Sequence, residues 1–99
     1  MTDSNQFNLG KVTVSFFAEK ALERSDQNAE EFLNQHKRGN WGEITAGEKQ
    51  QNDENVKNKD GKVLSAYETE MHEIIWIVTD FSKNTTTVLL PQEYDFGGY

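Results

Sequence analysis

The stretch Glu73-Ile74-Ile75-Trp76-Ile77-Val78-Thr79-Asp80 decides the fold, because only here do five large apolar residues follow one another. Branched and aromatic side chains favour strands, and a short apolar run without alternation is typical of a strand buried on both faces. Its odd-numbered and even-numbered side chains point to opposite sides of a sheet. We therefore expect a central strand that needs cover on both faces.

Further strands are predicted on either side of this stretch. Lys62–Glu68 precedes it and Thr85–Leu90 follows it, each across a short turn, which predicts an antiparallel meander. Pro91 ends the last strand because it cannot donate to the ladder. Near the N-terminus, residues 11–16 alternate with period two and predict a first strand at a sheet edge.

Three helices are predicted between the first strand and the meander. Asn28 is a suitable N-cap for the second helix and Gly39 a suitable stop, while Thr45 and Glu48 have the spacing of a capping box before the third. The predicted ranges are 17–24, 29–38 and 46–58. The order β-α-α-α-β-β-β indicates an α+β fold, with a mostly antiparallel sheet and helices packed on one face.

Length and composition indicate one small domain. Of the 99 residues, we expect 1–10 to be a flexible N-terminus, 11–94 the domain and 95–99 a C-terminal tail. The chain has no cysteine, and no signal segment or membrane-spanning apolar run is visible, so we expect a cytoplasmic protein. The two histidines have no partner at metal spacing, and no phosphate loop is present, so no metal or cofactor is expected.

The charge bears on possible partners. A net charge of -7 counts against direct nucleic-acid binding, which needs clustered lysine and arginine. The acidic excess lies in the C-terminal half, where it is either a solvated surface or a docking surface for a basic partner. The candidate partner-binding residues are Glu68, Glu70, Glu73, Trp76, Asp80 and Glu93.

The second face of the central strand has no obvious cover in the sequence. Either the C-terminal segment with Tyr94 and Phe96 folds over it, or a homodimer or another partner does.

A polar corner surrounds the Gly-bracketed Trp41. We interpret it as structural, with the indole N–H bonded to a backbone carbonyl. The helix 46–58 has a thin apolar stripe, so it is either loosely held or bonded to this corner by polar side chains. The residues of the polar corner are His36, Trp41, Glu43, Glu48, Asn52 and Tyr67.

The chain resembles a family of small uncharacterised bacterial proteins that accompany phages, plasmids and integrated elements. The resemblance runs over residues 11–94, and its motifs read roughly H-x-x-G-D-W-G, L-S-A-Y, W-I-I-T-E and T-T-V-L-L-P-x-E-Y. Here they are matched at residues 36–42, 64–67, 76–80 and 85–94, with Asn40 and Asp80 in place of the family's Asp and Glu. Some members are labelled as type I restriction subunits, but this chain has neither a Gly-rich cofactor loop nor a Pro-Pro motif.

The mobile-element setting implied by this resemblance favours a non-enzymatic binding protein. We expect it to act as an anti-CRISPR or anti-restriction protein. It would inhibit a nucleic-acid-targeting defence complex of the host by binding a basic surface of that complex. A structural or regulatory homodimer is the alternative. A small toxin-like RNase ranks lower, because such enzymes need basic residues at the site and this chain is acidic.

Overall fold

The computed structural model describes residues 7–97, so the predictions for residues 1–6, 98 and 99 lie outside the described residues. The elements are β1 (Lys11–Val14), α1 (Phe16–Arg24), α2 (Ala29–Lys37), α3 (Ala46–Asn58), β2 (Lys62–Glu68), β3 (Ile74–Asp80), β4 (Thr85–Leu89) and α4 (Pro91–Gly97). The α+β class and the order β-α-α-α-β-β-β of the first seven elements are confirmed. The predicted caps at Asn28 and Thr45 are also present.

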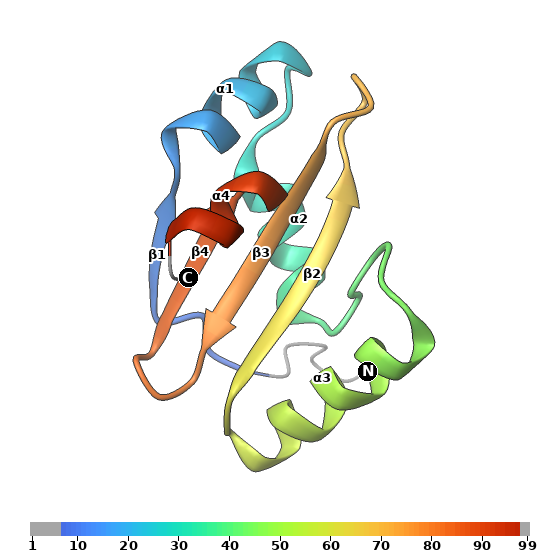
Figure 1. The fold of residues 1–99 in the computed structure, drawn as a ribbon, viewed down its shortest axis with the longest axis vertical. Coiled ribbons are helices and arrows are strands. Elements are labelled where there is room, and N and C mark those ends of the chain that lie inside the picture. Colours follow the sequence, from blue (N-terminus) through green and yellow to red (C-terminus); the bar gives the residue numbers. More distant parts are fainter. Residues whose placement is uncertain (1–6, 98–99) are drawn as a thin grey trace.

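The four strands form one mixed sheet in the order β1-β4-β3-β2 (Figure 1). β3 lies between β2 and β4 and is antiparallel to both, with Ser65 opposite Ile77 and Ile77 opposite Val88. β1 returns to the free edge of β4 and runs parallel to it. The predicted central strand and the predicted edge position of the first strand are therefore both correct.

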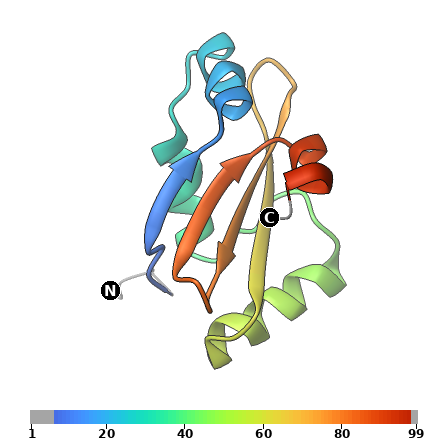
Figure 2. The same ribbon diagram turned by 60° about the vertical axis from the view of Figure 1, so that its left-hand side comes forward.

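The two faces of β3 are covered differently. Ile75 and Ile77 are fully buried and pack with apolar residues of α1 and α2, among them Ala21 and Phe32. On the opposite face Trp76 contacts Tyr94 of α4 edge-to-face, with ring centroids 5.5 Å apart. Figure 2 shows α4 on one side of the sheet and α1 with α2 on the other. The predicted cover by the C-terminal segment is therefore present at Tyr94, while the side chain of Phe96 lies outside the described residues and Ile74 on this face remains exposed. Cover by a homodimer or another partner stays a prediction.

The expected C-terminal tail is wrong in its extent, because α4 occupies residues 91–97. Pro91 ends the strand, as predicted, but it is also the first residue of this helix. Proline suits that position because its fixed backbone angle is helical and the missing N–H would have no helical partner. The turn signal after β4 is therefore also a helix start.

The expected flexible N-terminus is wrong for residues 7–10. Phe7 is buried in a second apolar cluster with Trp41, Val56 and Val63. Its ring lies 5.5 Å from the ring of Phe81. A single aromatic residue in a polar segment gives no periodic signal, although burying one is worth about 1.5–3 kcal/mol.

The β2 edge of the sheet is closed by side chains and by a loop. Glu43 donates its backbone N–H to Ala66, and Ala66 donates its own to Trp41, so residues 41–43 run beside β2. Gly42 allows this approach, because a Cβ there would lie 2.0 Å from the carbonyl oxygen of Ala66. From α3, the Asn52 amide bonds both the N–H and the C=O of Leu64. The polar side chains of α3 therefore attach it to the sheet.

Candidate protein-binding surface

The polar corner is a buried hydrogen-bond network around His36, which has no exposed surface. The imidazole Nδ1 lies 2.5 Å from the hydroxyl of Ser65, and Nε2 lies 2.9 Å from the hydroxyl of Thr79. The network continues from Thr79 to Thr86 over 2.7 Å, and Thr86 donates to the carbonyl of Leu9. These residues join α2 to three strands and to the N-terminal segment.

The bond from Thr86 to the Leu9 carbonyl fixes which group donates in each of the other hydrogen bonds of this network. Because the Thr86 hydroxyl donates to the Leu9 carbonyl, it accepts from Thr79. Thr79 then accepts from Nε2–H of His36, which leaves Nδ1 to accept from Ser65. His36 is thus a neutral imidazole, and burial lowers its pKa from 6.5 to about 3.

The His36–Ser65 pair has the atoms of a nucleophile and a base, but it is inaccessible. Both side chains are completely buried. The rings of Phe7 and Trp41 each lie 5.4 Å from the imidazole and contact it edge-on. The geometry therefore supports the structural interpretation of this corner.

Four of the six predicted corner residues lie in or beside this network, and two do not. His36, Trp41, Asn52 and Tyr67 are buried. Glu43 is exposed, and Glu48 is an exposed residue of the α3 capping box. The Trp41 indole donates to the Asp53 carboxylate at 3.0 Å rather than to a backbone carbonyl, because α3 presents that side chain to the corner.

The predicted partner-binding residues are not one surface. Glu68, Glu70 and Glu73 lie at the β2–β3 hairpin, whereas Asp80 is at the other end of β3, opposite Lys62 in the register. Hydrogen bonds from Ser82 lower the pKa of Asp80 and tie it to its own turn. These acidic residues are close in the sequence, which suggested one acidic surface. However, the seven-residue strand β3 separates Glu73 from Asp80.

Glu93 has a structural role. Its carboxylate accepts a hydrogen bond from the Ser15 hydroxyl at 2.7 Å and from the backbone N–H of Leu90 at 2.8 Å. Ser15 in turn caps α1 by accepting from the N–H of Ala18. Glu93 therefore links the starts of α1 and α4 through its Oε1 atom.

We expect Glu93→Ala to destabilise the protein by about 1–3 kcal/mol, because two donors lose a charged acceptor. Urea unfolding followed by circular dichroism measures this cost. Gln92→Ala, at the exposed neighbouring position, is the control and should change stability by less than about 0.5 kcal/mol. Equal midpoints for Glu93→Ala and the unchanged protein would contradict the assigned role.

The charge of the molecule is concentrated at one end. We define the acidic end as residues 16–31 with 68–73, which comprise α1, the start of α2 and the β2–β3 hairpin (top of Figure 1). It carries eight acidic and two basic residues, a net charge of −6 out of −7 for the whole chain. Five of these acidic residues lie in residues 16–31, whereas the sequence pattern predicts an acidic excess in the C-terminal half.

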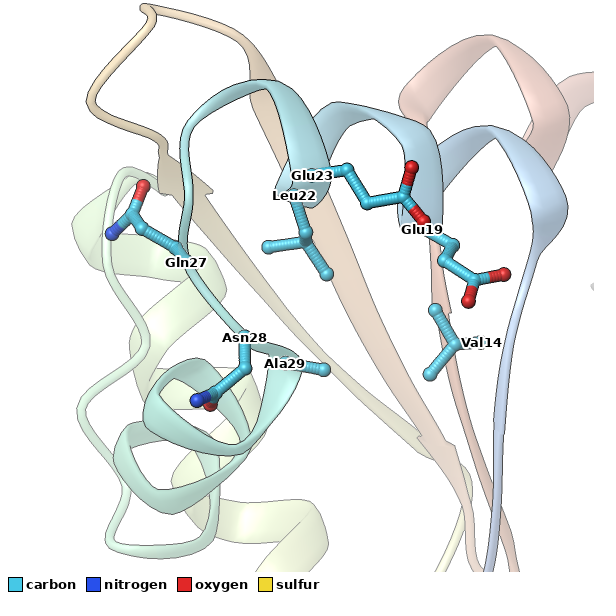
Figure 3. A pocket seen from close by; sticks show the side chains of 7 residues that line it. All are labelled: Val14, Glu19, Leu22, Glu23, Gln27, Asn28 and Ala29. Carbon is cyan, nitrogen blue, oxygen red and sulfur yellow. The ribbon is translucent and has the colours of Figure 1, made fainter.

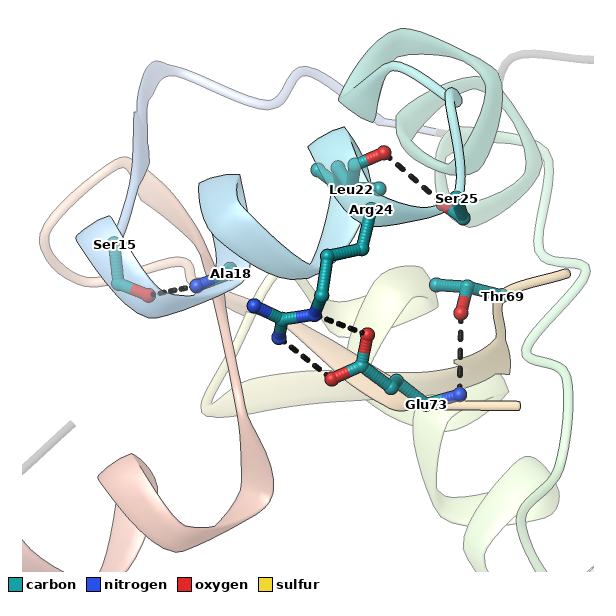
Figure 4. A network of polar contacts seen from close by, with 7 residues as sticks. All are labelled: Ser15, Ala18, Leu22, Arg24, Ser25, Thr69 and Glu73. Carbon is teal, nitrogen blue, oxygen red and sulfur yellow. Dashed lines mark hydrogen bonds and ion pairs between the residues drawn. The ribbon is translucent and has the colours of Figure 1, made fainter. Parts of the chain in front are cut away.

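An ion pair holds the two parts of the acidic end together. Arg24 donates from Nε and Nη2 to both carboxylate oxygens of Glu73, at 3.0 and 2.6 Å (Figure 4). The bond to Arg24 lowers the pKa of Glu73. The backbone N–H of Glu70 also donates to the side chain of Gln27. These bonds fix the hairpin against α1 and the loop that follows it.

Exposed apolar side chains lie within the acidic end and on the strands that adjoin it. Among residues 7–94, whose burial is described, six large apolar side chains are exposed: Val12, Val14, Phe16, Phe17, Met71 and Ile74. All six lie on β1, α1 or the β2–β3 hairpin. Phe16 and Phe17 are 62% and 58% exposed. Exposed apolar groups within a charged surface are typical of protein-binding sites.

A groove lies beside the acidic end, between β1, α1 and the start of α2 (Figure 3). Its volume is about 410 Å³. Val14, Leu22 and Ala29 form apolar walls, whereas Glu19 and Glu23 extend from α1 at the rim. The arrangement suits a side chain with an apolar stem and a cationic head.

The chain is thus a small α+β domain with a sealed polar core and an acidic, partly apolar end. Comparison with protein-family models, curated proteins and solved structures gives no match. None of the described helices is both long and apolar enough to cross a membrane. Within residues 7–97, no group of three or more histidine and acidic side chains is placed to hold a metal ion.

Proposed function

We propose that this chain is a non-enzymatic binding protein that uses its acidic end to occupy a basic surface of a nucleic-acid-targeting host defence complex. The observation that supports this most directly is that the acidic end, with its charge of −6, carries three of the six exposed large apolar side chains of residues 7–94, namely Phe16, Phe17 and Met71. The other three lie on β1 and at the start of β3. Charge attracts a basic partner over a distance, and apolar contact stabilises the complex once it forms. The choice of a CRISPR or restriction complex follows from the resemblance to proteins of mobile elements.

The test is protection of an invading phage or plasmid in cells that carry such a defence system. Expression of the chain should raise plating or transformation efficiency. With a purified effector complex, the chain should compete with DNA, more weakly at high salt because charge screening reduces the attraction. A failure to compete with DNA for any effector that recognises it through a basic groove would contradict the proposal.

Charge reversal identifies the surface. Glu19→Lys with Glu70→Lys places two cations on the acidic end and should weaken binding by about tenfold or more. Glu43→Lys with Glu54→Lys makes the same charge change on exposed positions elsewhere and should leave binding within about twofold. Equal effects of the two pairs would show that only net charge matters and would exclude a specific acidic surface.

A homodimer is the second candidate, favoured by the exposed Phe16 and Phe17. Sedimentation equilibrium tests it directly. A dimer that Phe16→Ser with Phe17→Ser dissociates would support it, whereas a monomer at high concentration would exclude it.

A further inference from the structure

The two edges of the sheet are treated differently. At β2, the outward backbone groups of Lys62, Leu64 and Ala66 are bonded by Asn55, Asn52 and residues 41–43. At β1, Lys11 donates to Asn84 and Ser15 donates to Val88, so the odd-numbered residues face β4. The N–H and C=O groups of Val12 and Val14 therefore point away from the sheet. Within residues 7–97, no backbone group pairs with them.

An open edge strand is a template for another strand. Val12 and Val14 are exposed, and their side chains lie on the α1 and α2 face, since they pair with the buried Thr86 and Val88. Directly opposite residues in a sheet share a face. The side chain of an added residue opposite Val14 would therefore enter the groove of about 410 Å³.

The chemistry of the groove selects this side chain. Its stem would contact Val14, Leu22 and Ala29, and its head would reach the carboxylates of Glu19 and Glu23. Lysine and arginine fit this arrangement because they bury their methylene groups and keep the charge at the rim. A second copy of this chain fits poorly, because pairing two β1 strands would bring two acidic ends of charge −6 together.

We propose that β1 accepts an extended segment of a basic partner as a fifth strand, with an arginine or lysine of that segment in the groove between α1 and α2. This rests on the proposed function and names the segment that the acidic end recognises. The four free backbone groups of Val12 and Val14 supply the pairing, and the groove supplies the selectivity.

The probe is an acetylated and amidated peptide of sequence Thr-Val-Thr-Arg-Thr-Val-Thr, titrated into the full chain by NMR and calorimetry. We expect shift changes on β1, α1 and the start of α2. Replacing the arginine by glutamate should abolish binding. Two further peptides test the pairing: one is N-methylated at the odd-numbered residues and the other at the even-numbered residues. One of the two should bind about tenfold or more weakly, because its methyl groups replace the N–H groups that pair with β1.

Two substitutions in the chain provide the matched test. Val12→Pro removes an outward N–H and should abolish peptide binding while the protein stays folded, because proline is tolerated where the N–H faces solvent at an edge. Glu19→Gln with Glu23→Gln should weaken binding of the arginine peptide by about tenfold. Thr13→Pro, whose N–H faces β4, should instead lower the unfolding midpoint.

The outcomes separate this inference from the proposed function. Peptide binding that depends on Glu19 and Glu23 but not on Val12→Pro or N-methylation overturns strand addition and leaves an acidic docking surface. Absence of peptide binding overturns the inference, whereas competition with an effector tests the function independently. A dimer that Val12→Pro dissociates would show that a second copy occupies the edge and would also overturn the inference.

Discussion

Trp41→Ala should destabilise the protein by about 3–5 kcal/mol, the cost of truncating a buried aromatic residue. Trp41 is 3% exposed and stacks on Phe7 with ring centroids 6.1 Å apart. Its ring also contacts His36, and its indole N–H bonds Asp53 of α3. Losing it removes contacts with α2, α3 and the N-terminal segment at once. A small domain has about 5–15 kcal/mol of stability, so this variant should be marginal.

Trp41→Phe and Asp53→Ala separate the packing from the hydrogen bond. Both variants remove the hydrogen bond between the indole and Asp53. Asp53→Ala keeps the whole Trp41 ring, so this variant should lower the free energy of unfolding by only about 0.5–1.5 kcal/mol. Urea unfolding followed by circular dichroism gives the three values. If Asp53→Ala cost as much as Trp41→Ala, the packing interpretation would be wrong.

Lowering the pH from 6.5 to 5 should destabilise the protein by about 2 kcal/mol, because burial lowers the pKa of His36 to about 3. The unfolded chain takes up a proton near the ordinary value of 6.5, whereas the folded chain does not. Stability is therefore complete above 6.5 and is lost at about 1.4 kcal/mol per pH unit toward 3. The lowered pKa values of Glu73 and Asp80 add to the loss only at lower pH.

The measurement is the urea midpoint between pH 5 and 7.5. His36→Gln offers a donor and an acceptor but no titration, so its profile should be flatter over this window, whatever its stability at pH 7. His72→Gln changes the other histidine, which is exposed and lies 2.7 Å from the Glu68 carboxylate, and it measures any part of the slope that comes from that pair. An equal slope for His36→Gln would assign the pH dependence to another group.

The residues of the sequence resemblance occupy positions that the structure explains physically. His36, Ser65, Thr79 and Thr86 form the buried network, and Gly42 permits the loop to approach β2. Tyr67 donates to the carbonyl of Asn40, and burial raises its pKa to about 12. These motifs therefore specify the packing of the domain, while the acidic end lies largely outside them. Asn40 takes part in this corner through its backbone carbonyl.

Local patterns were enough to predict most of the elements. The apolar run of β3, the capping box at Thr45 and the Asn28 cap act over a few residues, so they can be read directly from the sequence. The burial of Phe7 could not be predicted this way, because it depends on contacts with residues more than thirty positions away. The start of α4 is different, because the reciprocal bonds between Leu90 and Glu93 are local. Only its place on the sheet depends on distant contacts, those of Glu93 with Ser15 and of Tyr94 with Trp76.

The sequence by itself determined the α+β class, the central position of β3 and the acidic character of the surface, because periodicity, capping and composition are local or additive properties. The tertiary structure alone decided where the charge gathers: α1 and the β2–β3 hairpin, 49 residues apart at the Arg24–Glu73 pair, meet at one end. It also decided which edge of the sheet is closed and which is open. Both depend on how distant segments pack, and that arrangement places the exposed apolar residues, the groove and the free backbone of β1 beside the same carboxylates.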